Sequence, residues 1–325
     1  MLVLSEADVR RLVEIDELIA ALERAHAEFS TGGAVMPVRQ VVPLAEIGGR
    51  ITTMPAYLSA ERALGMKVVT FFKDNPARGL PAILGTIHLY SAESGKLAAV
   101  MDGTYITAIR TACASAAATK ALANPAAPVL GILGAGVQAR SHIAALARVT
   151  KIEKIKIYSP SGASARKVKD ELESVVKLPI EPAASAEAAV RGADLVVTAT
   201  SAPAPVLDRA WLKPGAHINA VGSHRPDLRE LDAATLKAAR VFVDSRDAIM
   251  AECGDVLLAI KEGAIQAADA STEIGEVLAK KKPGRVNPSD ITLYKSVGIA
   301  AQDVATAALV YRKALEKKAG VEVNI

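Results

Sequence analysis

The stretch PVLGILGAGVQARSHIAALARV, residues 128–149, most limits what this chain can fold into. An apolar run leads into GAGVQA, which matches the pattern G-x-G-x-x-G/A, and a helical pattern follows. In such a turn Gly134 permits the tight bend, Gly136 lets the backbone approach a pyrophosphate, and Ala139 keeps helix and strand close. The N-terminus of the helix supplies amide donors and the positive end of its dipole. The pattern predicts a strand, turn and helix that bind a dinucleotide.

The chain after this motif continues to alternate short apolar runs with helical patterns. We expect strands at 128–136, 152–159, 180–185, 194–201, 215–222 and 239–245, and helices at 137–149, 163–175 and 186–193. Right-handed crossovers between such strands give a parallel sheet that is covered on both faces. This part of the chain therefore predicts an α/β fold with a Rossmann-type parallel sheet.

The N-terminus carries the start and stop signals of helices. Ser5 and Asp8 form the pattern of a capping box, and Asp16 is expected to cap a second helix. The glycines of TGG, residues 31–33, are expected to end it. His26 lies in this second helix, and we expect it on the surface.

The following segment predicts a sheet of another kind. Short β-rich runs separated by Gly, Pro and Asn between 35 and 100 indicate a mostly antiparallel sheet, and an alanine-rich helix is expected over 104–123. A long amphipathic helix is expected over 296–318, and it follows the last sheet element. We therefore predict a smaller α+β domain, formed by residues 1–122 and 299–325, and a Rossmann domain, formed by residues 123–298.

Composition narrows the class of protein. A chain of 325 residues with 51% hydrophobic and 23% charged residues is globular and long enough for two domains. The net charge of +4 is spread along the chain, so we expect no nucleic-acid partner. No run of 18 apolar residues and no signal peptide is seen, so we expect no membrane span. Two cysteines, Cys113 and Cys253, make no disulfide framework, and we predict a cytoplasmic location.

The second expected strand ends in SPSGASARK, where a cofactor would meet the chain. NAD sites usually place an acid here to bind the ribose 2′-hydroxyl. This chain has hydroxyls and cations instead, namely Ser159, Ser161, Ser164, Arg166 and Lys167. Hydroxyls and cations can bind a 2′-phosphate, which a carboxylate would repel. We predict that NADP(H) is preferred, with NAD(H) as the alternative.

Three cations of the first domain stand out, and two of them, Lys67 and Arg110, are flanked by apolar or small residues. Arg39 lies in MPVRQVV, Lys67 in GMKVVTFF and Arg110 in TAIRTAC. Buried cations need an anionic partner, and a small carboxylate substrate is one such partner. Their spacing alone, however, favours three unrelated surface or ion-pair residues.

Several ordered motifs give the chain a resemblance to a known family. They are VMPVRQVVP, MPAYLSA, AVMDGTYITAIRTACASAAATK, LGAGVQARSH, KPGAHINAVGSHRPDLRELD, CGDVLLA, IGEVL and YKSVGIAAQD. With these motifs, the chain resembles the ornithine cyclodeaminase/μ-crystallin family over nearly its whole length. The resemblance implies that the first domain binds substrate and forms a homodimer.

The resemblance also implies roles for single residues. Arg39, Lys67 and Arg110 are expected to bind the carboxylate of the substrate, and Lys67 is also expected to be catalytic. The residues expected to bind the cofactor are Thr111, Gly134, Ala135, Gly136, Val137, Gln138, Ser159, Ser161, Arg166, Thr200, Val221, Gly222, Lys295 and Ser296. No metal site is expected, because no histidine pair has ligand spacing and the two cysteines lie far apart.

His224 and Thr52 indicate the branch of the family. Cyclodeaminases carry acids at the positions that match these two residues, and such acids hold the ammonium groups of a diamino acid. GSHRPDLRELD is instead most similar to the μ-crystallin and ketimine-reductase branch. His224 is a candidate catalytic proton donor, and a loop histidine without a role is the equal alternative.

These residues lead to one functional hypothesis and three alternatives. We predict an NAD(P)H-dependent reductase of small cyclic ketimine carboxylates, such as Δ1-pyrroline-2-carboxylate and Δ1-piperideine-2-carboxylate, that forms cyclic L-amino acids. The alternatives are an ornithine or lysine cyclodeaminase, an alanine dehydrogenase, and a ligand-binding crystallin-like protein without enzymatic activity.

Overall fold

The computed structural model describes residues 1–324, except the side chain of Pro76, and the chain forms two compact units. The first unit comprises residues 1–110 and 299–325, and the second comprises residues 111–298. The division therefore falls inside helix α3 (Thr104–Leu122), whereas the sequence placed the boundary at the end of that helix. The reason is packing, because Ala118 and Leu122 of α3 belong to a buried cluster of the second unit.

The first unit contains a sheet with the strand order β16-β1-β7-β6-β5-β4-β2, and β3 pairs with β4. Its strands are β1 (Leu2–Leu4), β2 (Ala34–Val35), β3 (Gln40–Leu44), β4 (Gly49–Leu58), β5 (Ala63–Phe72), β6 (Ile83–Ser91), β7 (Leu97–Asp102) and β16 (Val321–Glu322). The pairs from β2 to β7 are antiparallel, which confirms the predicted sheet. Strand β1 was not expected, and it joins β7 in parallel.

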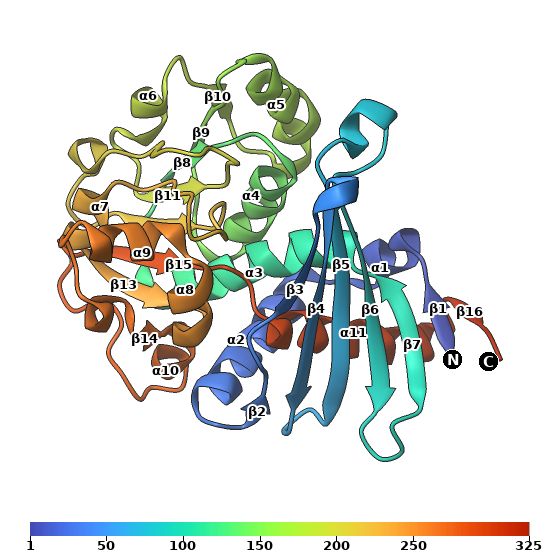
Figure 1. Cartoon of the computed structure of the whole chain (residues 1–325). Helices are drawn as coiled ribbons and strands as arrows, with labels where there is room; N and C mark the ends of the chain where they lie inside the picture. Colours follow the sequence, from blue (N-terminus) through green and yellow to red (C-terminus); the bar gives the residue numbers. More distant parts are fainter. Residues whose placement is uncertain (325) are drawn as a thin grey trace. The chain divides into compact units, whose positions relative to one another are not determined.

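Three helices of the first unit pack on this sheet, namely α1 (Glu6–Leu12), α2 (Ile15–Ser30) and α11 (Ala300–Lys317). The unit also contains the start of α3 and, in the connections between strands, the 3₁₀ turns η1 (Ala45–Ile47) and η2 (Asn75–Arg78). Helix α11, in red, contacts α2 and strands β4, β5 and β6, and most of its residues are buried (Figure 1). The C-terminal helix thus closes the core of the unit that contains the N-terminus.

Two expectations for the N-terminal helices need correction. The capping box of Ser5 and Asp8 is confirmed, but the residue that caps α2 is Glu14, and Asp16 lies in the first turn. There its negative charge can interact favourably with the helix dipole without capping the helix. His26 is not a surface residue, since only 1% of it is exposed. It faces α11, which the sequence could not place against α2.

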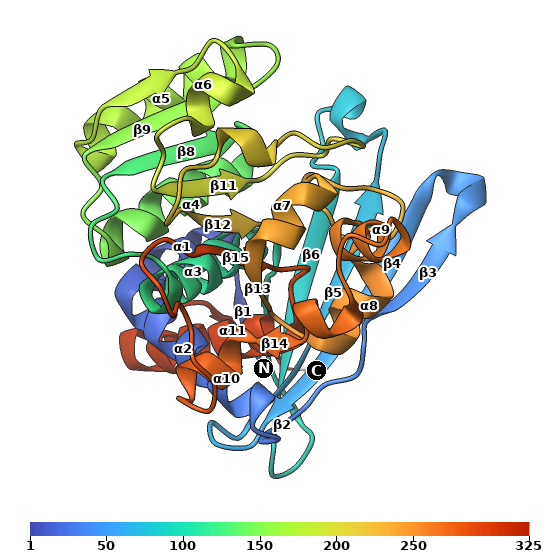
Figure 2. The ribbon, with the colours of Figure 1, turned by 90° about the vertical axis from the view of Figure 1, so that its left-hand side faces the viewer.

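The second unit contains a parallel sheet with the order β10-β9-β8-β11-β12-β15-β13-β14. Its strands are β8 (Val129–Leu133), β9 (Lys154–Tyr158), β10 (Ile180–Pro182), β11 (Leu195–Thr198), β12 (His217–Ala220), β13 (Ala239–Val243), β14 (Thr272–Glu273) and β15 (Ile291–Lys295). Its other elements are α4 (Val137–Val149), α5 (Ala163–Val176), α6 (Ala186–Val190), η3 (Arg209–Trp211), α7 (Ala233–Ala238), α8 (Arg246–Glu252), α9 (Gly254–Lys261), η4 (Ala267–Ala270) and α10 (Ile274–Leu278). Figure 2 shows β9, β8, β11 and β12 side by side. The predicted Rossmann-type α/β fold is confirmed.

Strands β14 and β15 were not predicted, and β15 inserts between β12 and β13. Its five residues, ITLYK, are all buried, and such a short run without regular alternation does not identify a strand by itself. Consecutive residues of β13 and β15 belong to two different clusters of buried hydrophobic residues. Val241 and Leu293 lie in the larger cluster on one face of the sheet, and Phe242 and Tyr294 lie in the smaller cluster on the other face. The sheet is therefore covered on both faces, as expected for parallel strands.

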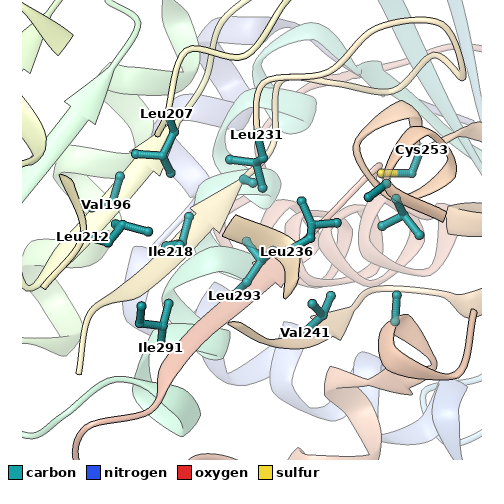
Figure 3. Packing of buried hydrophobic residues seen from close by; sticks show 14 of the residues in the cluster. Val196, Leu207, Leu212, Ile218, Leu231, Leu236, Val241, Cys253, Ile291 and Leu293 are labelled. Atoms are coloured by element: carbon teal, nitrogen blue, oxygen red, sulfur yellow. The ribbon is translucent and has the colours of Figure 1, made fainter. Parts of the chain in front are cut away.

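The larger of these clusters forms the main core of the second unit. Figure 3 shows Val196, Ile218 and Leu293 from neighbouring strands, together with Leu231 and Leu236 from the segment that crosses them. Cys253 also belongs to this core, and burial raises the pKa of its thiol to about 12. Such a thiol remains protonated and is unsuited to nucleophilic attack.

The strand order of this sheet reverses between β8 and β11. In open parallel sheets, ligands bind beyond the carboxyl ends of the strands at such a reversal. The fold thus selects one edge of the second unit for a cofactor.

Candidate active site

Two of the predicted carboxylate-binding residues of the first unit share one buried acid. The ammonium of Lys67, on β5, lies 2.8 Å from Oδ2 of Asp303, and Nε of Arg110 donates to Oδ1 at 2.9 Å. At most 5% of each of these three side chains is exposed. Because buried charges must be paired, Asp303 holds both cations in place.

A second layer of contacts fixes the guanidinium. Arg110 Nη1 donates to Oε1 of Gln302, and the Gln302 amide nitrogen lies 3.0 Å from Nε2 of His26. Burial, reinforced by the charge of Arg110, lowers the pKa of His26 to about 4, so the imidazole is neutral near pH 7. A neutral ring nitrogen can accept the amide proton, and this orients Gln302 toward Arg110.

Lys67 titrates close to neutrality. Burial lowers the pKa of its ammonium to about 7, the charge of Asp303 acts to raise it, and the charges of Arg110 and Arg39 act to lower it further. An amine with such a pKa can exchange a proton at neutral pH.

Arg39 and Thr52 complete the first unit's candidate residues. Arg39 is half-buried between β2 and β3, and its positive charge acts to lower the pKa of Lys67. Lys67 and Arg110 are related through Asp303, and a carboxylate-binding role for all three cations stays a prediction. Thr52 is buried in β4, where cyclodeaminases carry an acid.

The sequence did not predict that the cluster around Lys67 and Arg110 also contains Asp303, Gln302 and His26. The sequence did contain a signal for Asp303, which is a single acid in the apolar stretch AAQDVATAAL. A lone acid in an apolar helix requires a cationic partner.

The glycine turn of the second unit has the predicted form. Gly134 has a φ of +107°, and a Cβ there would lie 2.4 Å from the carbonyl oxygen of Ala199. Gly136, which precedes α4, has no described atom within 4 Å of the Cβ position, so the turn is open on the side where a phosphate would lie. Ala135 is half-buried and Val137 is exposed at the start of α4.

Two buried polar atoms near this turn lack a partner among residues 1–324. They are Oγ of Ser159, at the end of β9, and Oε1 of Gln138, in α4. Unpaired buried oxygens are costly, so each one indicates a group that the described residues do not supply. Together with the open turn, they fit a bound dinucleotide.

The loop after β9 places hydroxyls and a cation before and within α5. Ser161 and Arg166 are exposed, and the helix begins at Ala163. The exposed hydroxyl and guanidinium groups, together with the positive end of the α5 dipole, form a surface that suits an anion.

The remaining predicted cofactor residues lie in or close to the carboxyl edge of the sheet. Thr200 and Gly222 bind the carboxylate of Glu230, Lys295 is ion-paired with Asp255 at 2.9 Å, and Ser296 Oγ donates to Asp244 at 2.7 Å. Val221 is half-buried after β12, and Thr111 is buried in α3. The sequence did not predict a role for Glu230, Asp255 or Asp244. Two of them lie in the motifs that identified the family, Glu230 in RELD and Asp255 in CGDV.

His224 lies in the loop after β12 and is exposed. Its Nδ1 is 3.3 Å from the carbonyl oxygen of Gly222, which belongs to the same loop.

The described residues contain neither a candidate membrane span nor a candidate metal cluster. No helix within residues 1–324 is long and apolar enough to cross a membrane. Over the same range, no group of three or more His, Cys, Asp or Glu residues could hold a metal ion.

Comparison with known proteins gives a consistent set of similarities. Residues 1–318 match the model of the ornithine cyclodeaminase/mu-crystallin family. The chain is 43% identical to the ketimine reductase mu-crystallin of Mus musculus over 297 residues, which covers 90% of this chain and 91% of that protein.

Solved structures agree with these matches. The Δ1-pyrroline-2-carboxylate reductase of Thermococcus litoralis in complex with NADH and L-proline superposes with a TM-score of 0.96 at 40% identity, covering 99% of this chain and 100% of that one. An archaeal alanine dehydrogenase dimer with bound NAD gives a TM-score of 0.93 at 36% identity, covering 100% and 99% of the two chains.

Proposed function

Because this chain belongs to the ornithine cyclodeaminase/mu-crystallin family, we propose that it is an NAD(P)H-dependent reductase of small cyclic ketimine carboxylates. Substrates of this class include Δ1-pyrroline-2-carboxylate and Δ1-piperideine-2-carboxylate, and the products are cyclic L-amino acids. The chain is an oxidoreductase that acts on C=N groups.

The observation that carries the substrate class is a pair of buried cations, Lys67 and Arg110, that share the single carboxylate of Asp303. A small carboxylate would supply a second negative charge beside them, and arginine can bind it through two parallel hydrogen bonds. Fixing the carboxylate also fixes the adjacent C=N carbon, which favours a near-attack geometry.

The proton for the imine nitrogen requires a donor, and Lys67 is suited to this role. Its pKa of about 7 lets the ammonium release a proton at neutral pH. A bound carboxylate adds negative charge nearby and raises the proton affinity of Lys67, so substrate binding favours the protonated form. His224 is the second candidate donor.

The second unit supplies the cofactor site in this proposal. Gly134 and Gly136 form the turn for the pyrophosphate, and Ser159 with the N-terminus of α5 binds the adenosine ribose. When bound, the cofactor supplies the hydride for the C=N carbon. We propose that NADPH is preferred, because hydroxyls and Arg166 stand where an acid would favour NADH.

Two observations address the alternatives. A diamino acid needs carboxylates for its ammonium groups, and residues 52 and 224 are Thr and His, so a cyclodeaminase is disfavoured. The alanine dehydrogenase relative remains the second candidate function, since a carboxylate grip and a small pocket would also suit alanine.

We further propose that the protein is a homodimer in a reducing compartment, such as the cytoplasm. Exposed apolar side chains in and around β3, among them Val35, Val41, Val42 and Ile47, support self-association of the first unit. Cys113 and Cys253 are free and buried, which supports a reducing location.

A spectrophotometric screen tests the function. NADPH and NADH are each offered with both cyclic ketimines and with pyruvate plus ammonia or methylamine, and L-ornithine is offered with NAD⁺. We expect the highest kcat/KM with a cyclic ketimine. A higher value with pyruvate plus ammonia would favour alanine dehydrogenase, and ammonia release from ornithine at a matching rate would refute the assignment.

A further inference from the structure

The carboxyl edge of the parallel sheet is held together by a buried acid with no role in the proposed function. Strands β11 and β12 are neighbours, with Thr198 opposite Ala220 at their ends. Thr200 and Gly222 follow these ends, and both are predicted cofactor residues. Glu230 lies eight residues beyond Gly222, in the segment that returns across the sheet.

The Glu230 carboxylate is fully buried and binds both strand ends. Oε1 accepts hydrogen bonds from the backbone N–H of Thr200 at 2.6 Å and from its hydroxyl at 2.7 Å. Oε2 accepts from the backbone N–H of Gly222 at 2.8 Å and from the Thr198 hydroxyl at 2.9 Å. Each oxygen thus has two donors, and the two oxygens together join β11 to β12.

Close packing leaves these strand ends little freedom to move. A Cβ on Gly222 would lie 2.3 Å from the Thr200 carbonyl oxygen and 2.4 Å from Oε1 of Glu230. Glycine is therefore required at 222 for the backbone to approach both groups.

The backbone of Glu230 is itself held by Asp255 of helix α9. The backbone N–H groups of Glu230 and Leu231 donate to Oδ1 of Asp255 at 2.7 and 2.9 Å. Asp255 is ion-paired at 2.9 Å with Lys295, the last residue of β15, and both side chains are fully buried. A buried ion pair therefore supports the backbone of Glu230 while its side chain binds the strand ends.

We propose that Glu230 is a positioning residue for the nicotinamide cofactor, because its carboxylate sets the spacing and orientation of Thr200 and Gly222 at the edge where a parallel sheet binds its ligand. The proposal rests on the proposed function. Burial raises the pKa of Glu230, and the charge of Lys295 opposes this change. The four donated hydrogen bonds also favour the ionised form, which alone can accept all of them.

A matched control lies at the opposite edge of the same sheet. Asp194, just before β11, accepts a hydrogen bond from the backbone N–H of Val129 at 3.0 Å and pairs with Lys213 at 2.6 Å. Like Glu230, it joins two neighbouring strands, but at their amino ends. Asp194→Asn therefore reports the general cost of loosening this sheet.

The test compares Glu230→Gln with Asp194→Asn in the full chain. A carboxamide has only one acceptor oxygen. In Glu230→Gln the side-chain NH₂ group would therefore replace one carboxylate oxygen and face the hydrogen-bond donors of one of the two strand ends. We expect the Kd for NADPH, from a fluorescence titration, to rise about tenfold or more. The KM for NADPH should rise with it, while the KM for the ketimine changes by no more than about twofold. Asp194→Asn should change neither KM beyond that range.

A readout without cofactor separates positioning from catalysis. In the unliganded protein, hydrogen exchange of the amides of Thr200 and Gly222 should be faster in Glu230→Gln and unchanged in Asp194→Asn. Unchanged NADPH affinity in Glu230→Gln, or a loss no larger than in the control, would overturn the proposal.

Thr198→Val keeps the test decisive if Glu230→Gln does not fold. It removes one donor to the carboxylate and retains the shape of the side chain, so we expect the same pattern with about a threefold rise in the Kd. Should this variant instead bind NADPH like the unmodified chain, the proposal fails. If the unmodified chain binds neither NADPH nor NADH and reduces no ketimine, the proposed function fails instead.

Discussion

At the scale of single residues, the chemistry of this protein depends on two buried cations that share one acid. Asp303 binds both Lys67 and Arg110. Burial lowers the pKa of the Lys67 ammonium to about 7, the charge of Asp303 acts to raise it, and the charge of Arg110 acts to lower it further. The first three predictions concern Lys67, Asp303 and His224.

Lys67 should control the pH dependence of the reaction. The ammonium binds the carboxylate and donates the proton, and its pKa in the free protein is about 7, so kcat/KM should fall as the pH rises through 7. In the pH profile of kcat, the corresponding fall should occur at higher pH, because the bound carboxylate stabilises the protonated form of Lys67. Lys67→Met should lower kcat/KM about 10²-fold or more.

Lys67→Arg is the control for this prediction. Arginine remains charged at any accessible pH, so it should restore much of the substrate affinity but not kcat, and the limb near pH 7 should disappear. A limb that persists in this variant would assign the ionisation to the imine or to another residue.

Asp303→Asn should weaken turnover without preventing cofactor binding. Removing this anion lowers the pKa of Lys67 further, so the falling limb of kcat/KM should move to lower pH. Loss of the charge-assisted hydrogen bond between Asp303 and Arg110 should reduce kcat/KM about tenfold or more. Glu61→Gln is the matched control, since Glu61 also binds two cations, Arg24 and Arg312, but at a more exposed place. Equal losses in both variants would argue against a role for Asp303.

His224→Ala distinguishes the two candidate proton donors. The imidazole is exposed and its ring lies near a carbonyl of its own loop, so we expect kcat to fall by less than about tenfold. A fall of about 10²-fold, with loss of an ionisation near neutrality, would identify His224 as the donor in place of Lys67.

At the scale of elements, we expect the loop between β9 and α5 to determine which cofactor is preferred. It presents Ser161 and Arg166 to solvent and ends at the N-terminus of α5, while Ser159 has a buried hydroxyl without a partner among the described residues. These groups can bind a phosphate on the ribose, and none of them carries a negative charge.

We expect kcat/KM with NADPH to exceed that with NADH by about tenfold or more, which is about 1.4 kcal/mol of transition-state binding. Ser159→Asp should reverse the preference, because a carboxylate accepts the 2′-hydroxyl and repels a 2′-phosphate. Val175→Asp, at the exposed C-terminal end of α5, controls for added charge. An NADH advantage of about tenfold in the unmodified chain would refute the NADPH preference.

At the scale of the whole molecule, the proposed dimer gives the exposed apolar residues of the first unit a partner. We expect a mass of twice 33.8 kDa by light scattering. Val42→Asp should shift the protein toward the monomer, because it places a charge in the proposed interface. Val175→Asp, on exposed α5 of the second unit, should leave the mass unchanged. A monomeric unmodified chain would exclude the dimer.

The sequence by itself determined the features that depend on neighbouring residues. Alternating apolar runs and helical patterns identified the parallel sheet, Ser5 and Asp8 identified a capping box, and GAGVQA identified the turn before α4. Each of these follows from local backbone geometry and hydrogen bonding, which a short segment contains in full. The motifs spread along the chain also identified the family.

The tertiary structure alone decided which distant residues meet. Asp303 joins Lys67 and Arg110, which precede it by more than 190 residues, and Glu230 joins two strand ends through the burial of its carboxylate. The place of β15 between β12 and β13 and the burial of His26 beneath α11 are further examples. A buried charge or a short apolar strand is stable only with its partner, and that partner is fixed by the packing of the whole chain, because no local pattern records the pairing.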